Sequence, residues 1–121
     1  MAIRKGRHRI QEFALIQALA RRFAKNSSHL VQGIGDDAAV IAATTPAWWH
    51  VTTDLLAEGV HFDLRTASAE SVGYRAAMAN LSDIAAMGAS PRYLLVSLAA
   101  PRTFTAARIV ELYEGLMQAC G

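Results

Sequence analysis

A long helical repeat between residues 68 and 88 is the feature that most constrains how this chain folds. Its apolar side chains recur at steps of three and four residues, the spacing of one helix face. They are Tyr74, Ala77, Met78, Leu81, Ile84, Ala85 and Met87. Ser68 stands where a helix begins, and Gly88 suits the left-handed conformation that ends one. The pattern predicts the main core helix of one compact domain, the usual content of 121 residues.

Two further segments predict amphipathic helices. Between Gln11 and Lys25 apolar side chains share one face and polar ones the other. The apolar ones are Phe13, Leu15, Ile16, Leu19 and Phe23. The segment Thr105–Gln118 repeats the pattern with Ile109, Leu112, Leu116 and Met117. Each helix is therefore expected to pack one face on a core.

Short runs of β-branched, aromatic and aliphatic residues predict three strands, at residues 39–41, 48–53 and 93–98. The predicted order is helix, strand, strand, helix, strand, helix. Helices layered on a sheet follow from this order, in an α+β or an α/β arrangement.

Charge and cysteine content exclude several classes of protein. The formal net charge is only +2, and much of the excess lies in residues 1–10, a basic N-terminal arm more typical of a solvated terminus than of a nucleic-acid-binding surface. The single Cys120 cannot form an internal disulfide. The apolar stretch Met78–Met87 is interrupted by polar residues and is too short to cross a bilayer. No signal-peptide pattern opens the sequence, so we expect a cytoplasmic protein.

Four aspartates lie where their oxygens can face a ligand. Asp36 and Asp37 lie in a turn after two glycines, Asp54 follows a predicted strand, and Asp83 lies in the main helix. Mg²⁺ prefers hard oxygen ligands and is commonly held by a few carboxylates plus substrate phosphates. The hydroxyl groups of Thr52 and Thr53 beside Asp54 fit the same chemistry. The pattern is compatible with a magnesium site.

The same residues also have structural interpretations. Asp36 and Asp37 are typical of turns held by bonds from side chain to backbone. Asp83 is costly to bury without a partner or a metal, yet it can also lie on an exposed stripe of its helix. His61, in the loop after Asp54, suits contact with a phosphate or with a ligand ring, but a lone histidine is more often an ordinary surface residue.

Known nucleotide and hydrolase motifs do not occur. The glycines at 33 and 35 lack the Lys-Ser or Lys-Thr pair of a P-loop and the third glycine of a dinucleotide fingerprint. No serine, histidine and acid set stands in a nucleophile-elbow context. Trp48 and Trp49 would point to opposite faces of a strand, one to the core and one to an oligomer contact.

Three ordered blocks resemble thiamine-monophosphate kinases. They are GIGDDAAV at 33–40, TTDLLAEGVHF at 52–62 and NLSDIAAMGA at 80–89, and the opening EFALI at 12–16 is similar too. The resemblance runs from about residue 11 to the end, and the wider superfamily includes aminoimidazole ribonucleotide synthetase. It implies an α+β fold, with a mixed or antiparallel sheet covered by helices.

The resemblance also implies a reaction and a site. ATP would give its terminal phosphoryl group to thiamine monophosphate, with Mg²⁺ ions between phosphates and aspartates. The implied magnesium ligands are Asp37, Thr52, Thr53, Asp54 and Asp83. His61 would lie at the thiamine phosphate, and Asp36 would help to shape the turn.

Finally, the resemblance implies a larger assembly. Residues 11–121 correspond to an N-terminal domain that forms homodimers through its sheet. A Gly-Gly-Asp-Thr-Thr block and a C-terminal domain would follow Gly121, so we expect this chain to be inactive alone. The alternative is a non-catalytic dimeric binding or interaction module that reuses the fold.

Overall fold

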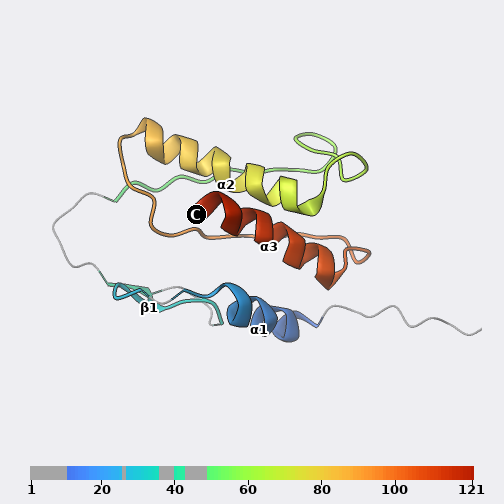
Figure 1. Cartoon of the computed structure of the whole chain (residues 1–121), viewed down its shortest axis with the longest axis horizontal. Coiled ribbons are helices and arrows are strands. Elements are labelled where there is room, and N and C mark those ends of the chain that lie inside the picture. Colours follow the sequence, from blue (N-terminus) through green and yellow to red (C-terminus); the bar gives the residue numbers. More distant parts are fainter. Residues whose placement is uncertain (1–10, 26, 36–39, 43–48) are drawn as a thin grey trace, which may run out of the picture.

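The computed structural model describes residues 11–25, 27–35, 40–42 and 49–121. The elements in chain order are helix α1 (Glu12–Phe23), strands β1 (Leu30–Gln32) and β2 (Val40–Ile41), and helices α2 (Ala69–Ala86) and α3 (Ala106–Cys120). Figure 1 shows α2 and α3 side by side, with α1 and β1 on the other side of α3. The three helices predicted from apolar spacing are confirmed, with ends shifted by a few residues.

The close packing of α2 on α3 depends on two glycines. A Cβ atom on Gly73 would overlap the backbone carbonyl of Leu112, and one on Gly115 would overlap that of Glu70. The two helix backbones therefore touch directly, with no side chain between them at the crossing. The buried residues of α2 are correspondingly small: Ala69, Val72, Gly73 and Ala77. This explains why α2 contributes little bulk to the core, although its sequence predicts the main core helix.

The ends of the helices follow the sequence signals. The Ser68 hydroxyl accepts a hydrogen bond from the Ser71 amide at 3.1 Å, which satisfies one of the free N–H groups at the start of α2. At the other end, Gly88 has φ +68°, and the amide of Ala89 donates to the carbonyl of Ile84. That is a Schellman ending, which needs the left-handed conformation that glycine adopts easily. The predicted stop at Gly88 is confirmed.

Helix α1 packs on α3 with only part of its apolar surface. Leu19 is buried in a cluster with Phe104 and Ile109. Phe23 lies against Tyr113, with ring centroids 5.7 Å apart. Phe13, by contrast, is largely exposed, so the apolar face of this helix is wider than the surface that α3 covers.

The sheet is small and antiparallel. Strand β1 pairs with β2, with Leu30 opposite Ile41 and Gln32 opposite Val40. The strand after the aspartates was predicted, whereas its partner β1 was not. Helices with a segregated antiparallel sheet define the α+β class, which confirms the expected fold class.

The other two predicted strands are wrong for the part of the chain that the structure describes. Residues 49–53 and 93–98 pair with no neighbouring strand. Their apolar side chains remain in solvent: Val51 is 87% exposed and Leu95 is 81% exposed. A β-branched or aliphatic run becomes a strand only where a second strand offers backbone partners, and none lies beside either run here. Trp49 is exposed, and Trp48 lies outside the described residues.

Candidate functional site

Thr52 and Asp83 come from two different sequence blocks, and the fold brings them together. The Thr52 hydroxyl donates a hydrogen bond to Oδ2 of Asp83 at 3.0 Å. Thr52 lies in the segment that precedes the loop at 55–65, and Asp83 lies in the last turns of α2. The 31 residues that separate them show that this contact depends on the tertiary fold.

Of the other three predicted magnesium ligands, the two that the structure describes form no hydrogen bond with Asp83. Thr53 and Asp54 are exposed and follow Thr52 directly along the chain. Asp37, together with its neighbour Asp36, lies outside the described residues. The structure therefore joins two of the five predicted ligands by a direct contact and leaves two more next to them in sequence.

Helix α2 itself favours a cation at this place. Asp83 lies in its C-terminal turn, where the helix dipole is negative, and that turn contains no basic residue. Asp83 is exposed, so the expectation of a costly buried carboxylate is replaced by the exposed alternative. A carboxylate in this position gains from a bound cation more than the same group at a helix N-terminus would.

Among the described residues, no three histidine, cysteine, aspartate or glutamate side chains lie close enough together to hold a metal ion. The described residues bring together one carboxylate, that of Asp83, and one hydroxyl group, that of Thr52. Such a set is suited to Mg²⁺, which usually keeps several waters and shares its ligands with phosphates.

His61 lies in a tightly folded loop. Its Nδ1 atom accepts a hydrogen bond from the backbone amide of Ala57 at 3.0 Å, and its carbonyl oxygen accepts one from Arg75 at 2.6 Å. The side chain is exposed. Arg75 was not among the predicted site residues, because nothing in its spacing distinguishes it from any other polar residue of α2.

An ion pair closes the far end of this loop. Asp63 accepts hydrogen bonds from the side chain and the backbone amide of Arg65. The side-chain bond from the Arg65 guanidinium lowers the pKa of Asp63 below its ordinary value, and the backbone bond adds to this effect. The carbonyl of Asp63 also accepts hydrogen bonds from the amides of Thr66 and Ala67, in the turn that leads into α2.

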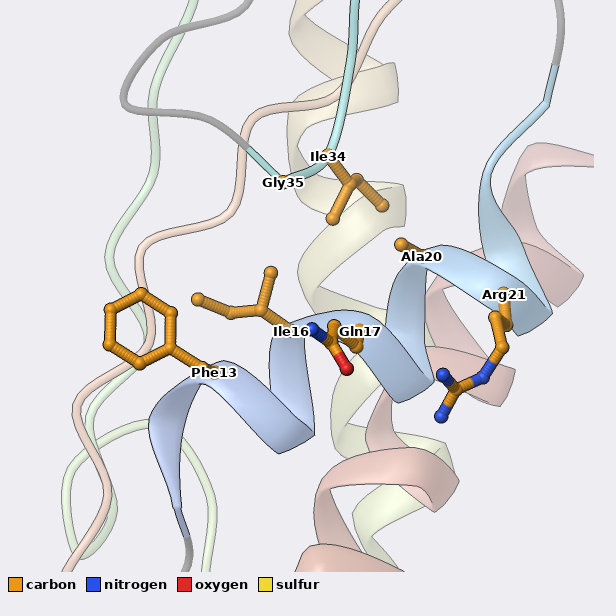
Figure 2. A pocket seen from close by; sticks show the side chains of 7 residues that line it. All are labelled: Phe13, Ile16, Gln17, Ala20, Arg21, Ile34 and Gly35. Carbon is orange, nitrogen blue, oxygen red and sulfur yellow. The ribbon is translucent and has the colours of Figure 1, made fainter.

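A shallow hollow lies away from these residues, between α1 and the end of β1 (Figure 2). It measures about 330 Å³ and is mainly apolar, with Arg21 as its charged residue. Figure 2 shows Phe13 and Ile16 on α1 below Ile34, which precedes the Gly35 turn. The exposed face of α1 described above forms one wall of this hollow, which sequence reasoning did not predict.

The chain belongs to the family described as AIR synthase related protein, N-terminal domain, whose match covers residues 35–121. This confirms the superfamily that the three sequence blocks indicated. Helix α1 lies before the matched region.

The chain is also similar to individual proteins, and the three described here are thiamine-monophosphate kinases. The chain is 45% identical over 107 residues to a thiamine-monophosphate kinase of Bacillus subtilis, covering 88% of this chain and 33% of the relative. It is 42% identical to one of Synechococcus elongatus (68% and 25% covered) and 36% identical to one of Mycobacterium tuberculosis (91% and 32% covered). The predicted resemblance to this group is confirmed.

The similarity has a limited extent. The chain spans between a quarter and a third of the length of these relatives. No solved structure matches the chain. None of the helices in the described ranges is both long and apolar enough to cross a membrane.

Proposed function

We propose that this chain is the N-terminal part of a kinase that transfers the terminal phosphoryl group of ATP to thiamine monophosphate. The observation that carries the proposal is the contact between Thr52 and Asp83. It joins the TTD block to the NLSD block, two of the three blocks that resemble thiamine-monophosphate kinases. In this reaction a phosphate oxygen of thiamine monophosphate bonds to the γ-phosphorus of ATP, and ADP leaves with the former bridging oxygen.

Asp83, Thr52 and Asp54 are the residues we propose to hold Mg²⁺, with Thr53 and Asp37 as further ligands. Asp54 is exposed and lies two residues after Thr52, which contacts Asp83 directly. When bound there, Mg²⁺ neutralises charge that develops on the transferred phosphoryl group. The acidic C-terminal turn of α2 supports a cation at this position.

His61 is proposed to contact the phosphate of thiamine monophosphate. Its exposed ring and the hydrogen bond that Nδ1 accepts leave the Nε2 edge for a ligand. The remaining nucleotide contacts would come from a C-terminal domain, because this chain spans only about a third of the kinase relatives. The reaction would take place in the cytoplasm.

A homodimer is part of the proposal. The two segments that were predicted as strands carry exposed apolar side chains and have no strand partner here. Unpaired segments of this kind are ready to pair with another chain. A second copy of this chain would supply both the backbone partners and an apolar surface.

The test is an ADP-release assay with thiamine monophosphate, ATP and Mg²⁺, with the product identified by mass. It is run on this chain alone and with a C-terminal domain supplied as a second chain or in the same reading frame. Direct binding of Mn²⁺, a spectroscopic substitute for Mg²⁺, is measured in parallel on the wild type and on Asp83→Asn. We expect the substitution to weaken Mn²⁺ binding at least about tenfold, because a charged ligand is lost.

Three outcomes separate the hypotheses. Turnover that requires the C-terminal domain and is lost in Asp83→Asn supports the proposal. Metal-dependent ATP binding without turnover in any form points to an additional missing part. A stable dimer with neither metal-dependent ATP binding nor turnover contradicts the kinase proposal and favours a non-catalytic interaction module.

A further inference from the structure

The loop that carries His61 is held by its own backbone. The carbonyl of Ala57 accepts hydrogen bonds from the amides of Val60 and His61, at 3.2 and 2.9 Å. The amide of Gly59 donates to the carbonyl of Phe62 at 2.7 Å, and Gly59 has φ +80°, which a residue with a Cβ atom adopts only with strain. These bonds give the loop around His61 its local shape but do not join it to the rest of the fold.

The same loop selects one tautomer of the His61 ring. The Nδ1 atom accepts the amide hydrogen of Ala57, so Nδ1 carries no proton. The neutral ring then carries its proton on Nε2, which makes the outer edge of the ring a hydrogen-bond donor. A donor on an exposed ring edge suits an anionic oxygen such as that of a phosphate.

Arg75 connects this loop to α2. Its guanidinium donates to the carbonyl oxygen of His61 at 2.6 Å, a charge-assisted bond between residues 14 positions apart. Arg75 and Asp83 lie on the same helix, eight residues apart, which corresponds to about 12 Å along the axis. Helix α2 therefore positions both residues: Asp83 is part of the helix, and His61 is bonded to it through Arg75.

We propose that Arg75 is a positioning residue that holds His61 as an Nε2–H donor at a fixed offset from the Asp83 carboxylate. The ligand class is a phosphate monoester. The inference rests on the proposed function for its ligand, thiamine monophosphate. The tautomer of His61 and its hydrogen bond with Arg75 are properties of this chain, so they can be measured without any ligand. Arg75 acts through His61 and does not itself contact the phosphate.

The first test is NMR on ¹⁵N-histidine-labelled chain at mildly alkaline pH, with wild type, Arg75→Met and Arg75→Lys. We expect the wild-type His61 ring to show the Nε2–H tautomer with a hydrogen-bonded Nδ1. Arg75→Met should give a mixture of tautomers and at least about tenfold faster hydrogen exchange of the Ala57 amide, because a charged hydrogen bond is lost. Arg75→Lys should retain part of the wild-type pattern, and circular dichroism verifies that each variant is folded.

A matched control is Arg65→Met. It removes one positive charge from the same loop, but Arg65 bonds Asp63 and not His61. We expect the His61 spectrum and the exchange of the Ala57 amide to stay as in the wild type. If both arginine variants change the His61 ring equally, the effect is one of charge alone and the proposal is wrong.

Ligand binding provides the second test, with thiamine monophosphate as the probe and unphosphorylated thiamine as the reference. Arg75→Met should weaken binding of the monophosphate about tenfold while leaving thiamine unchanged. Weaker binding with an unchanged His61 spectrum would overturn the proposal, because Arg75 would then be a direct phosphate ligand. If the wild type binds no thiamine monophosphate even when the C-terminal domain is supplied, the proposed function fails, whereas the NMR result still decides the role of Arg75.

Discussion

The helix pair and the two extended segments of this protein use their apolar residues in opposite ways. Helices α2 and α3 meet through Gly73 and Gly115, so closely that their backbones touch. In the segments at 49–57 and 90–100, large side chains such as Leu95 lie in solvent. The helix pair therefore buries its apolar surface within one chain. The extended segments leave their apolar side chains exposed, where a second chain can contact them.

This difference separates the stability of a single folded chain from the stability of a complex between two chains. The helix pair contains most of the buried residues, so the free energy of unfolding of one chain should depend mainly on it. The extended segments contribute little to a single chain and should matter when a second polypeptide covers them. Four predictions test this separation, in order of decreasing effect.

Gly115→Ala should have the largest effect, because its new methyl group overlaps the backbone of Glu70 and no side chain can move away to accept it. We expect the free energy of unfolding to fall by about 2 kcal/mol or more. Urea denaturation followed by circular dichroism measures the change. Gly33→Ala is the control, since its methyl group would meet only the flexible side chain of Leu30. Equal effects of the two substitutions would contradict the importance of the helix crossing.

Leu95→Lys should leave the stability of one chain within about 0.5 kcal/mol, because the side chain is already exposed. Self-association should weaken by at least about 2 kcal/mol, since a charge would enter the proposed interface. Sedimentation equilibrium measures this difference. Thr103→Lys, which adds the same charge at an exposed position outside this segment, serves as the control. An unchanged dimer constant in Leu95→Lys would show that this segment is not covered by a second copy.

Ser68→Ala should destabilise the folded chain by about 1 kcal/mol, because the hydrogen bond that caps α2 is lost. Thermal unfolding by circular dichroism is a sufficient measurement. Ser68→Asp is expected to retain most of the stability, since aspartate also caps helices and suits the positive end of the dipole. If the alanine and aspartate variants are equally destabilised, the side chain does not act as a cap.

The smallest effect concerns pH. Burial against α1 raises the pKa of Tyr113 above its ordinary value of about 10. The folded state thus favours the protonated phenol, so its contribution is complete below pH about 10 and is lost as the pH rises through the raised pKa. The ultraviolet absorbance of tyrosinate, compared between wild type and Tyr113→Phe, should show one phenol that ionises late. A titration of Tyr113 at the ordinary pH would mean that α1 does not cover it.

Local signals predicted the helices well and the sheet poorly. Ser68 and Gly88 mark the ends of α2 through bonds to their own neighbours, so their effect can be read without tertiary information. The runs at 48–53 and 93–98 have strand composition, but strand formation requires a partner that the sequence does not specify. Strand β1 was not predicted, because its three residues are too few to show a strand pattern.

For the candidate site too, the sequence predicted some features and only the tertiary structure decided others. The sequence alone determined which residue types are present for magnesium and phosphate, because oxygen ligands and a histidine at motif spacing are a local property. Only the tertiary structure decided that Thr52 meets Asp83 and that Arg75 holds the carbonyl of His61. Contacts between residues far apart in sequence depend on how helices pack, and here that packing is set by two glycines whose role appears only when α2 and α3 lie together.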